Sequence, residues 1–131
     1  MKNNILILAS VIALSSVANA NSKGKELFMA KCTSCHTIGK PSNISNVVAP
    51  AIKGVMFHMN EEFANDKEMI EDHINDIVLN PTKEKAICKS VRRFGLMPSQ
   101  KGNITKEDLA LIAKWMVNDL KAGYGKKEKH K

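Results

Sequence analysis

The sequence predicts an all-α domain of four to five helices, and three observations support this fold class. Apolar residues recur at spacings of three and four along most of the chain after residue 20. No stretch alternates apolar and polar residues as a half-buried strand does, and no hairpin turn joins a pair of such stretches. The length of 131 residues suits one domain with a modest core.

The first and last predicted helices are the most clearly patterned. The first runs from about Lys23 to Cys35. The last follows Thr105, which with Asp108 forms a variant of the capping box, and continues with apolar residues to Leu120. Gly123 and Gly125 are expected to end it.

Between these helices the pattern is weaker. A middle helix is predicted over Glu68 to Leu79, with its apolar residues on one face, ending at Asn80 and Pro81. A further short helix is predicted over about Thr82 to Arg93. Residues 39–60 contain Pro41, Pro50, Gly39 and Gly54 and are predicted to form an irregular connection.

The most informative motif is the run Cys32-Thr33-Ser34-Cys35-His36, which is the attachment signature of a c-type haem. Thiols three positions apart project from the same side of a helical turn, so they can add to two vinyl groups on one edge of a porphyrin. The following His36 supplies an axial imidazole to the iron. The motif therefore predicts one covalently attached haem c with its iron. A dithiol redox pair or half of a zinc site on the same residues is the alternative.

The N-terminal segment predicts export. Met1 and Lys2 open a charged region, Ile5 to Leu14 form an apolar region, and Ala18-Asn19-Ala20 is a small-x-small cleavage site. We expect residues 1–20 to be a cleaved secretory signal peptide, which makes the chain periplasmic, followed by a haem domain over 21–124 and a basic tail over 125–131. An uncleaved anchor is the alternative, although the apolar run is shorter than the roughly 20 residues that span a bilayer.

The mature chain resembles class I cytochrome c over almost its whole length. Lys23-Gly24-Lys25-Glu26-Leu27-Phe28 before the haem motif is similar to the N-terminal helix of that family, and Trp115 is similar to the aromatic residue of its C-terminal helix. The resemblance implies the cytochrome c fold, in which these two helices cross closely because Gly24 lacks a Cβ. Ala49-Pro50-Ala51-Ile52 is similar to the segment whose proline packs beside the haem histidine. This implies that the Pro50 carbonyl orients His36 through its second nitrogen.

The resemblance also implies the sixth iron ligand. Met97, in Phe94-Gly95-Leu96-Met97-Pro98, stands just before the last helix, where the family carries its distal ligand. A thioether is soft and neutral, so it favours ferrous iron and raises the reduction potential relative to a second histidine. The rival ligands left open by the sequence are Met56, His58, Met59, His73 and His130.

With both axial positions filled by protein, the iron would have no open site, which predicts electron transfer rather than catalysis. The sequence contains no nucleophile beside a base and no phosphate-binding glycine loop. We therefore expect a periplasmic monohaem carrier of single electrons between respiratory partners, and not an enzyme. The alternative is a haem subunit, or a gas-binding or sensor domain, of a larger complex.

The net charge of +7 suggests the kind of partner. Seven basic residues flank segments expected near the haem and could steer docking to acidic patches on redox proteins: Lys23, Lys25, Lys31, Lys40, Arg92, Arg93 and Lys101. A merely solvated surface is the alternative. We do not expect the protein to bind nucleic acid or to insert stably into a membrane. We expect it to be a monomer. The odd thiol, Cys88, is expected to be buried on the short helix, with a reactive or intermolecular role as the alternative.

Overall fold

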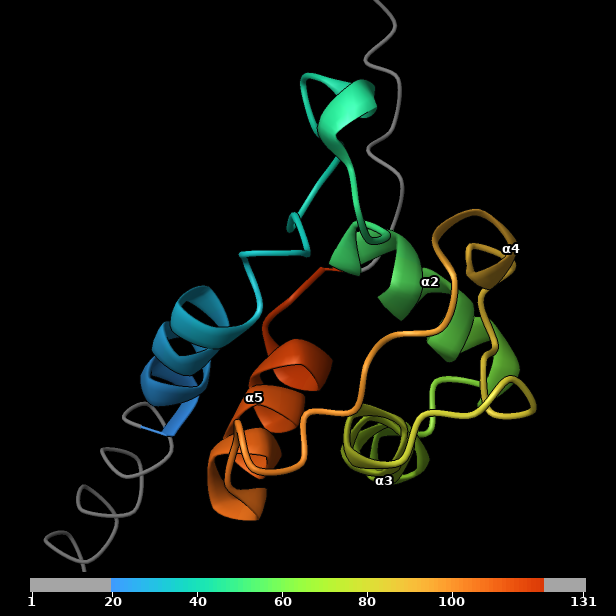
Figure 1. Cartoon of the computed structure of the whole chain (residues 1–131). Helices are drawn as coiled ribbons and strands as arrows, with labels where there is room; N and C mark the ends of the chain where they lie inside the picture. The colour runs from blue at the N-terminus through green and yellow to red at the C-terminus, as the bar shows by residue number, and fades with distance from the viewer. Residues whose placement is uncertain (1–19, 122–131) are drawn as a thin grey trace, which may run out of the picture.

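A computed structural model describes residues 20–121. Residues 20–31 within this range are helical, and they are followed by the short 3-10 helix η1 (Ile44–Asn46) and four α-helices. These are α2 (Ile52–Glu62), α3 (Lys67–Leu79), α4 (Val91–Phe94) and α5 (Lys106–Asn118). Across the described residues, the only pairing of strand type is an isolated bridge between Lys101 and Ile104. The predicted all-α cytochrome c fold is confirmed (Figure 1).

The helix over residues 20–31 packs directly against α5 (Figure 1). A Cβ built on Gly24 would lie 2.7 Å from the Trp115 Cβ and closer still to the Leu111 carbonyl oxygen. The rings of Phe28 and Trp115 have their centroids 5.2 Å apart with a 45° tilt. The predicted contact of Gly24, Phe28 and Trp115 is therefore present, and it depends on the missing side chain of Gly24.

Helices α3 and α5 also pack against each other, and both begin with a side-chain cap. Asp66 accepts from the backbone N–H of Met69, and Thr105 accepts from that of Asp108 at 3.1 Å. Helix α3 lies within one residue of its predicted bounds. Its buried Ile70 and Ile74 join the core, which is completed by Phe28, Ile52, Met56, Met59, Leu109, Ile112, Ala113, Trp115 and Met116.

The prediction of an irregular connection over residues 39–60 was wrong for its second half, which forms α2. The buried residues of this helix are Ile52, Gly54, Met56 and Met59. Ile52, Met56 and Met59 are spaced four and three apart, which is a helical face that the neighbouring Pro50 and Gly54 concealed. Burial of this face outweighs the low helix propensity of Gly54, which costs about 1 kcal/mol relative to alanine.

The predicted helix over Thr82 to Arg93 was also largely wrong. Only Val91–Phe94 is helical, and residues 81–90 form turns and irregular backbone. Lys85 ties this segment to the end of α3, because its Nζ lies 2.6 Å from Asp76 Oδ2 and donates to the Asn80 carbonyl at 3.1 Å. Ala86, Ile87 and Cys88 line the cavity described below rather than one face of a helix.

The described ends also differ from the sequence-based expectations. The first helix was expected to reach Cys35, but it gives way after residue 31 to hydrogen-bonded turns over 32–35. Helix α5 ends at Asn118, before the expected glycine stops. The predicted signal region up to residue 19, the stops Gly123 and Gly125, and the tail over 125–131 lie outside the described residues.

Candidate functional site

The Cys32–His36 motif occupies a tight turn at the end of the first helix. Cys32 N–H donates to the Phe28 carbonyl at 2.9 Å, which continues the helical pattern by one residue. The N–H groups of Cys35 and His36 then both donate to the Cys32 carbonyl, at 3.2 and 2.9 Å. Within the described residues, neither Cys32 nor Cys35 forms a disulfide. Helical hydrogen bonding up to Cys32 and a turn beyond it bring the two thiols and the imidazole to the wall of one cavity.

That cavity has a volume of about 450 Å³, within the range of roughly 300–1,000 Å³ usual for cofactor pockets. Its wall is mainly apolar, with residues from the first helix, α2, α3, α5 and the segment 81–104. Cys32, Cys35, His36 and Met97 all belong to it, although Met97 follows His36 by 61 positions in the sequence. The fold thus brings together all four residues predicted to bind the haem and its iron.

His36 is held by its second ring nitrogen. Its Nδ1 lies 2.8 Å from the Pro50 carbonyl oxygen, which is the contact that the sequence resemblance implied. The Pro50 segment is itself fixed, because the N–H groups of Ile52 and Lys53 donate to the carbonyls of Thr37 and Ile38 at 2.8 and 2.9 Å. A hydrogen bond at Nδ1 sets the tautomer and leaves Nε2 as the nitrogen able to bind a metal.

Met97 is half-buried in the loop between α4 and α5. The loop starts at Gly95, whose φ of 77° lies in the left-handed region that favours glycine. Beyond Met97, Ser99 Oγ donates to the Leu79 carbonyl at 2.6 Å, and Gln100 N–H donates to the Val78 carbonyl at 3.0 Å. The loop that carries the thioether is therefore anchored to the C-terminal end of α3.

The rival ligands differ in position. His58, Met59 and His73 line the same cavity, as does Met116, which sequence reasoning did not single out. Met56 is 2% exposed and packs in the core instead of the cavity wall. His130 lies outside the described residues. Met116 could have been found from its place one residue after Trp115 on the apolar face of α5.

Cys88 is the third free thiol, and it also lines the cavity. The expectation that it sits on a short helix was wrong, because it lies in a bend before α4. It is half-buried, so the expected burial is met only in part.

Burial and local charge shift the pKa values of two cavity residues. Burial raises the pKa of the Cys32 thiol, and the nearby Lys31 opposes this shift. Burial lowers the pKa of His73, while Asp76 opposes the shift. Both residues are therefore biased toward their neutral forms.

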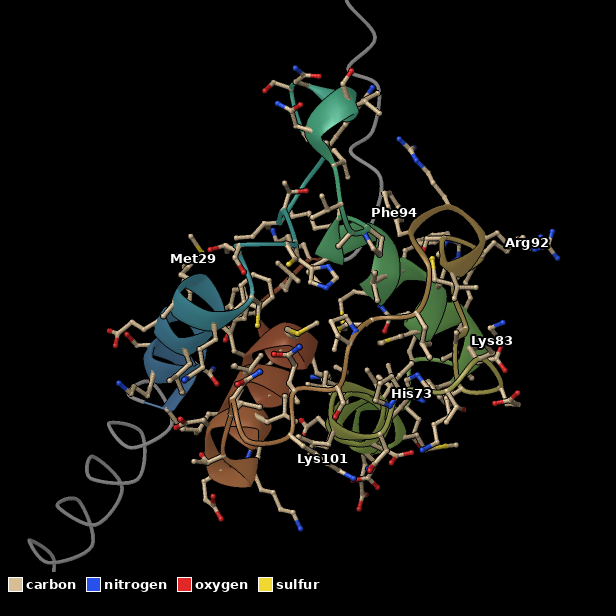
Figure 2. The ribbon with its side chains drawn as sticks, in the orientation of Figure 1. Met29, His73, Lys83, Arg92, Phe94 and Lys101 are labelled. Atoms are coloured by element: carbon tan, nitrogen blue, oxygen red, sulfur yellow. The ribbon has the colours of Figure 1, made fainter. Side chains whose placement is uncertain are left out.

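The predicted basic residues lie at the surface. Lys31 is at the cavity edge, and Arg92 and Arg93 form the last turn of α4. Figure 2 shows Arg92 extending away from the body of the molecule. Val48 and Leu96, which also line the cavity, are 62% and 38% exposed, so the cavity mouth has an apolar rim with cations nearby.

This all-α domain has an apolar cavity lined by two cysteines, the histidine that follows them and a methionine from a later loop, and these are the features of a c-type cytochrome. The family model described as cytochrome C oxidase, cbb3-type, subunit III matches residues 19–116, and the chain belongs to this family. No curated protein and no solved structure gives a significant match. Within residues 20–121, no helix combines the length and apolar character that crossing a membrane requires.

Membership identifies the cofactor and the broad function. The chain is a class I c-type cytochrome that binds covalently attached haem c with iron, serves electron transfer and has redox proteins as partners. The cavity fits this group, because it is large and apolar, it is lined by two cysteines that form no disulfide, and its histidine keeps one ring nitrogen available for iron. Family membership favours an electron carrier or redox subunit over a catalytic enzyme.

Proposed function

We propose that this chain is an exported monohaem cytochrome that carries single electrons between respiratory redox partners. Cys32 and Cys35 would hold the haem through thioether bonds, and His36 and Met97 would bind its iron. The observation that carries the proposal is the shared cavity wall, which contains both the motif at residues 32–36 and Met97, although about half of the chain separates them.

The haem supplies a one-electron ferric/ferrous couple when bound. The chain's own residues hold the two side chains proposed to bind the iron and limit the access of water to the haem. The Pro50 contact fixes the His36 ring, and the bonds from Ser99 and Gln100 to α3 fix the loop of Met97. With both ligand side chains held in this way, little rearrangement would accompany electron transfer, and the apolar wall would limit the access of water to the haem.

The absorbance spectrum of the mature, haem-loaded protein tests this proposal. We expect a thioether-linked haem in the pyridine haemochrome assay, a low-spin ferrous spectrum unchanged by carbon monoxide, and a weak ferric band from thioether ligation. Met97→Ala should lose that band and bind carbon monoxide, whereas Met59→Leu, a change in another cavity methionine, should keep it. Loss of the band in Met59→Leu and not in Met97→Ala would transfer the distal role to Met59.

A second candidate function is favoured by the family itself, whose description names an oxidase subunit. In this case the chain would be a haem-bearing subunit of a larger complex, without a freely diffusing stage. Purification from the native host under gentle conditions separates the two functions. A carrier elutes as a small monomer, and a subunit elutes with oxidase partners and their additional haems.

We also propose that residues 1–20 are a signal peptide, that residues 21–124 form the haem domain, and that the protein works in the periplasm. The support is the charged, apolar and small-residue order of the first 20 residues together with the haem motif that follows. N-terminal sequencing of the purified protein tests this. A start at Asn21 agrees with cleavage, and a retained Met1 contradicts it.

A further inference from the structure

The loop over residues 39–51, which contains η1, stands out from the helices between the first helix and α2 (Figure 1). Its base is closed, because the N–H groups of Ile52 and Lys53 donate to carbonyls of the segment just before the loop at 2.8 and 2.9 Å. Its tip is held as well, since Asn43 Oδ1 accepts from Ser45 N–H at 2.9 Å. A projecting loop that is fixed at base and tip is pre-organised for contact, because it has little backbone freedom left to lose.

Large apolar side chains on this loop are exposed to solvent. Ile44 is 52% exposed, Val48 is exposed further, and no residue of η1 is buried. Val48 also lines the haem cavity, as does the exposed Leu96 on the loop of Met97. These two residues give the cavity mouth an apolar rim, and Ile44 extends the apolar surface toward the tip of the loop. Because these side chains contribute little to the core, their exposure is typical of a contact site for another molecule.

The charged residues are divided between two sides of the molecule. Residues 27–60, which include the loop, and residues 85–106, which include α4, contain Lys and Arg but no Asp or Glu. In the view of Figure 1, the loop and α4 lie at the upper side of the molecule and α3 at the lower side. Lys40 on the loop and Arg92 on α4 are both exposed, so the side with the apolar loop is positive and complements an acidic surface. The carboxylates of α3 are Glu68, Glu71, Asp72 and Asp76.

We propose that the loop over residues 39–51 docks this cytochrome on its redox partner, with Ile44 and Val48 entering an apolar hollow that has acidic surroundings. The inference rests on the proposed function, because it names the surface through which the protein exchanges electrons. Cys35 is exposed and lines the cavity, so a partner at the cavity mouth would approach the haem from the side of that bond. A redox protein fits this surface better than an anionic membrane does, because electron transfer needs a second redox centre close to the haem.

Binding to coated gold tests the proposal with a film that has the chemistry of such a partner. The haem-loaded protein is applied to a film of mixed carboxylate-ended and methyl-ended alkanethiols, and to a film in which hydroxyl ends replace the methyl ends. Surface plasmon resonance gives the association constant, and voltammetry on the same gold gives the haem redox wave. We expect the wild-type protein to bind the film with methyl ends about tenfold more tightly, because its exposed apolar side chains are buried there.

Ile44→Ser should remove most of this preference both at about 0.1 M and at about 1 M salt, because salt does not screen an apolar contact. Arg92→Gln should weaken binding only at the lower salt, since the screening length falls from about 10 Å to about 3 Å. Met69→Ser is the matched control, because Met69 is also 52% exposed but lies on α3, and it should keep the preference. Ile44→Leu retains an apolar side chain and should bind as the wild-type protein does.

Three results would each overturn the inference: equal binding of the wild-type protein to the two films, a preference that survives in Ile44→Ser, and an equal loss in Met69→Ser. Phosphatidylglycerol vesicles give a second measurement. If they bind the wild-type protein and Ile44→Ser abolishes that binding, the loop contacts membrane and the inference is wrong. A missing haem wave would count against the proposed function, whereas the plasmon measurement would still decide the role of the loop.

Discussion

Replacing Gly24 with alanine should destabilise the haem-loaded protein by opening the contact between the first helix and α5. The added Cβ would lie 2.7 Å from the Trp115 Cβ and nearer still to the Leu111 carbonyl oxygen. Neither atom is the end of a flexible side chain. The two helices must therefore move apart, which also disturbs the packing of Phe28 on Trp115.

The magnitude follows from two opposing effects. Overpacking in a rigid contact costs about 1–3 kcal/mol. Because the nearest atom here belongs to the backbone carbonyl of Leu111, we expect the upper part of this range, about 2–3 kcal/mol. Alanine regains about 0.5–1 kcal/mol over glycine in a helix. The net loss is about 1–2.5 kcal/mol. For a domain of this size, that loss lowers Tm by roughly 4–20 °C.

Thermal unfolding followed by circular dichroism and by the haem absorbance band measures the effect. Gly39→Ala is the matched control, because a Cβ built there meets nothing within 4 Å and the residue is not among those with positive φ. Its stability should be unchanged, or raised by up to about 1 kcal/mol. If Gly24→Ala unfolds at the wild-type temperature, the close helix contact does not constrain the fold and our reasoning fails.

Three further changes test other parts of the structure. Ile70→Ala should lower the free energy of unfolding by about 2–5 kcal/mol, because Ile70 is 0% exposed. Met69→Ala, at a neighbouring residue that is 52% exposed, should change it by less than about 0.5 kcal/mol. Equal denaturation midpoints for the two variants would contradict the assigned core. Thr105→Ala should lower the free energy of unfolding in urea by about 1 kcal/mol, because it removes the side chain that accepts from Asp108 N–H at the start of α5. An unchanged urea midpoint would show that this cap does not stabilise the helix. Ser99→Ala removes the hydrogen bond to the Leu79 carbonyl, so it should lower the free energy of unfolding by about 0.5–1.5 kcal/mol and the temperature at which the ferric thioether band is lost. A band that survives to the wild-type temperature would show that this bond does not hold the Met97 loop.

Features with a local cause were predictable from the sequence. Asn80 and Pro81 mark the end of helix α3, and the capping Thr105 marks the start of α5, so these ends could be placed from the sequence. The contact of Gly24 with Trp115 and the bond from His36 to Pro50 came from the family resemblance. Periodicity alone could not have paired residues so far apart.

Features that depend on the cavity were not predictable from local pattern. Residues 82–90 have a plausible helical composition, yet Lys85 is held by Asp76 and the apolar side chains after it face the cavity. Helix α2 was missed for the opposite reason, because Gly54 disfavours a helix that burial of Met56 and Met59 stabilises. The place of His73 in the cavity wall has no signal in the sequence, since a histidine on a helix is usually solvated or packed.

The contact of Gly24 with α5 also has a consequence for the order of events during biogenesis. A chain that emerges from the ribosome with its N-terminus first exposes Cys32, Cys35 and His36 well before Trp115. The roughly 80 residues between them take about 4–16 s to be synthesised at about 5–20 residues per second. Until α5 arrives, Trp115 cannot pack on Phe28, so the contact between the first and last helices forms only after the whole haem motif has been synthesised.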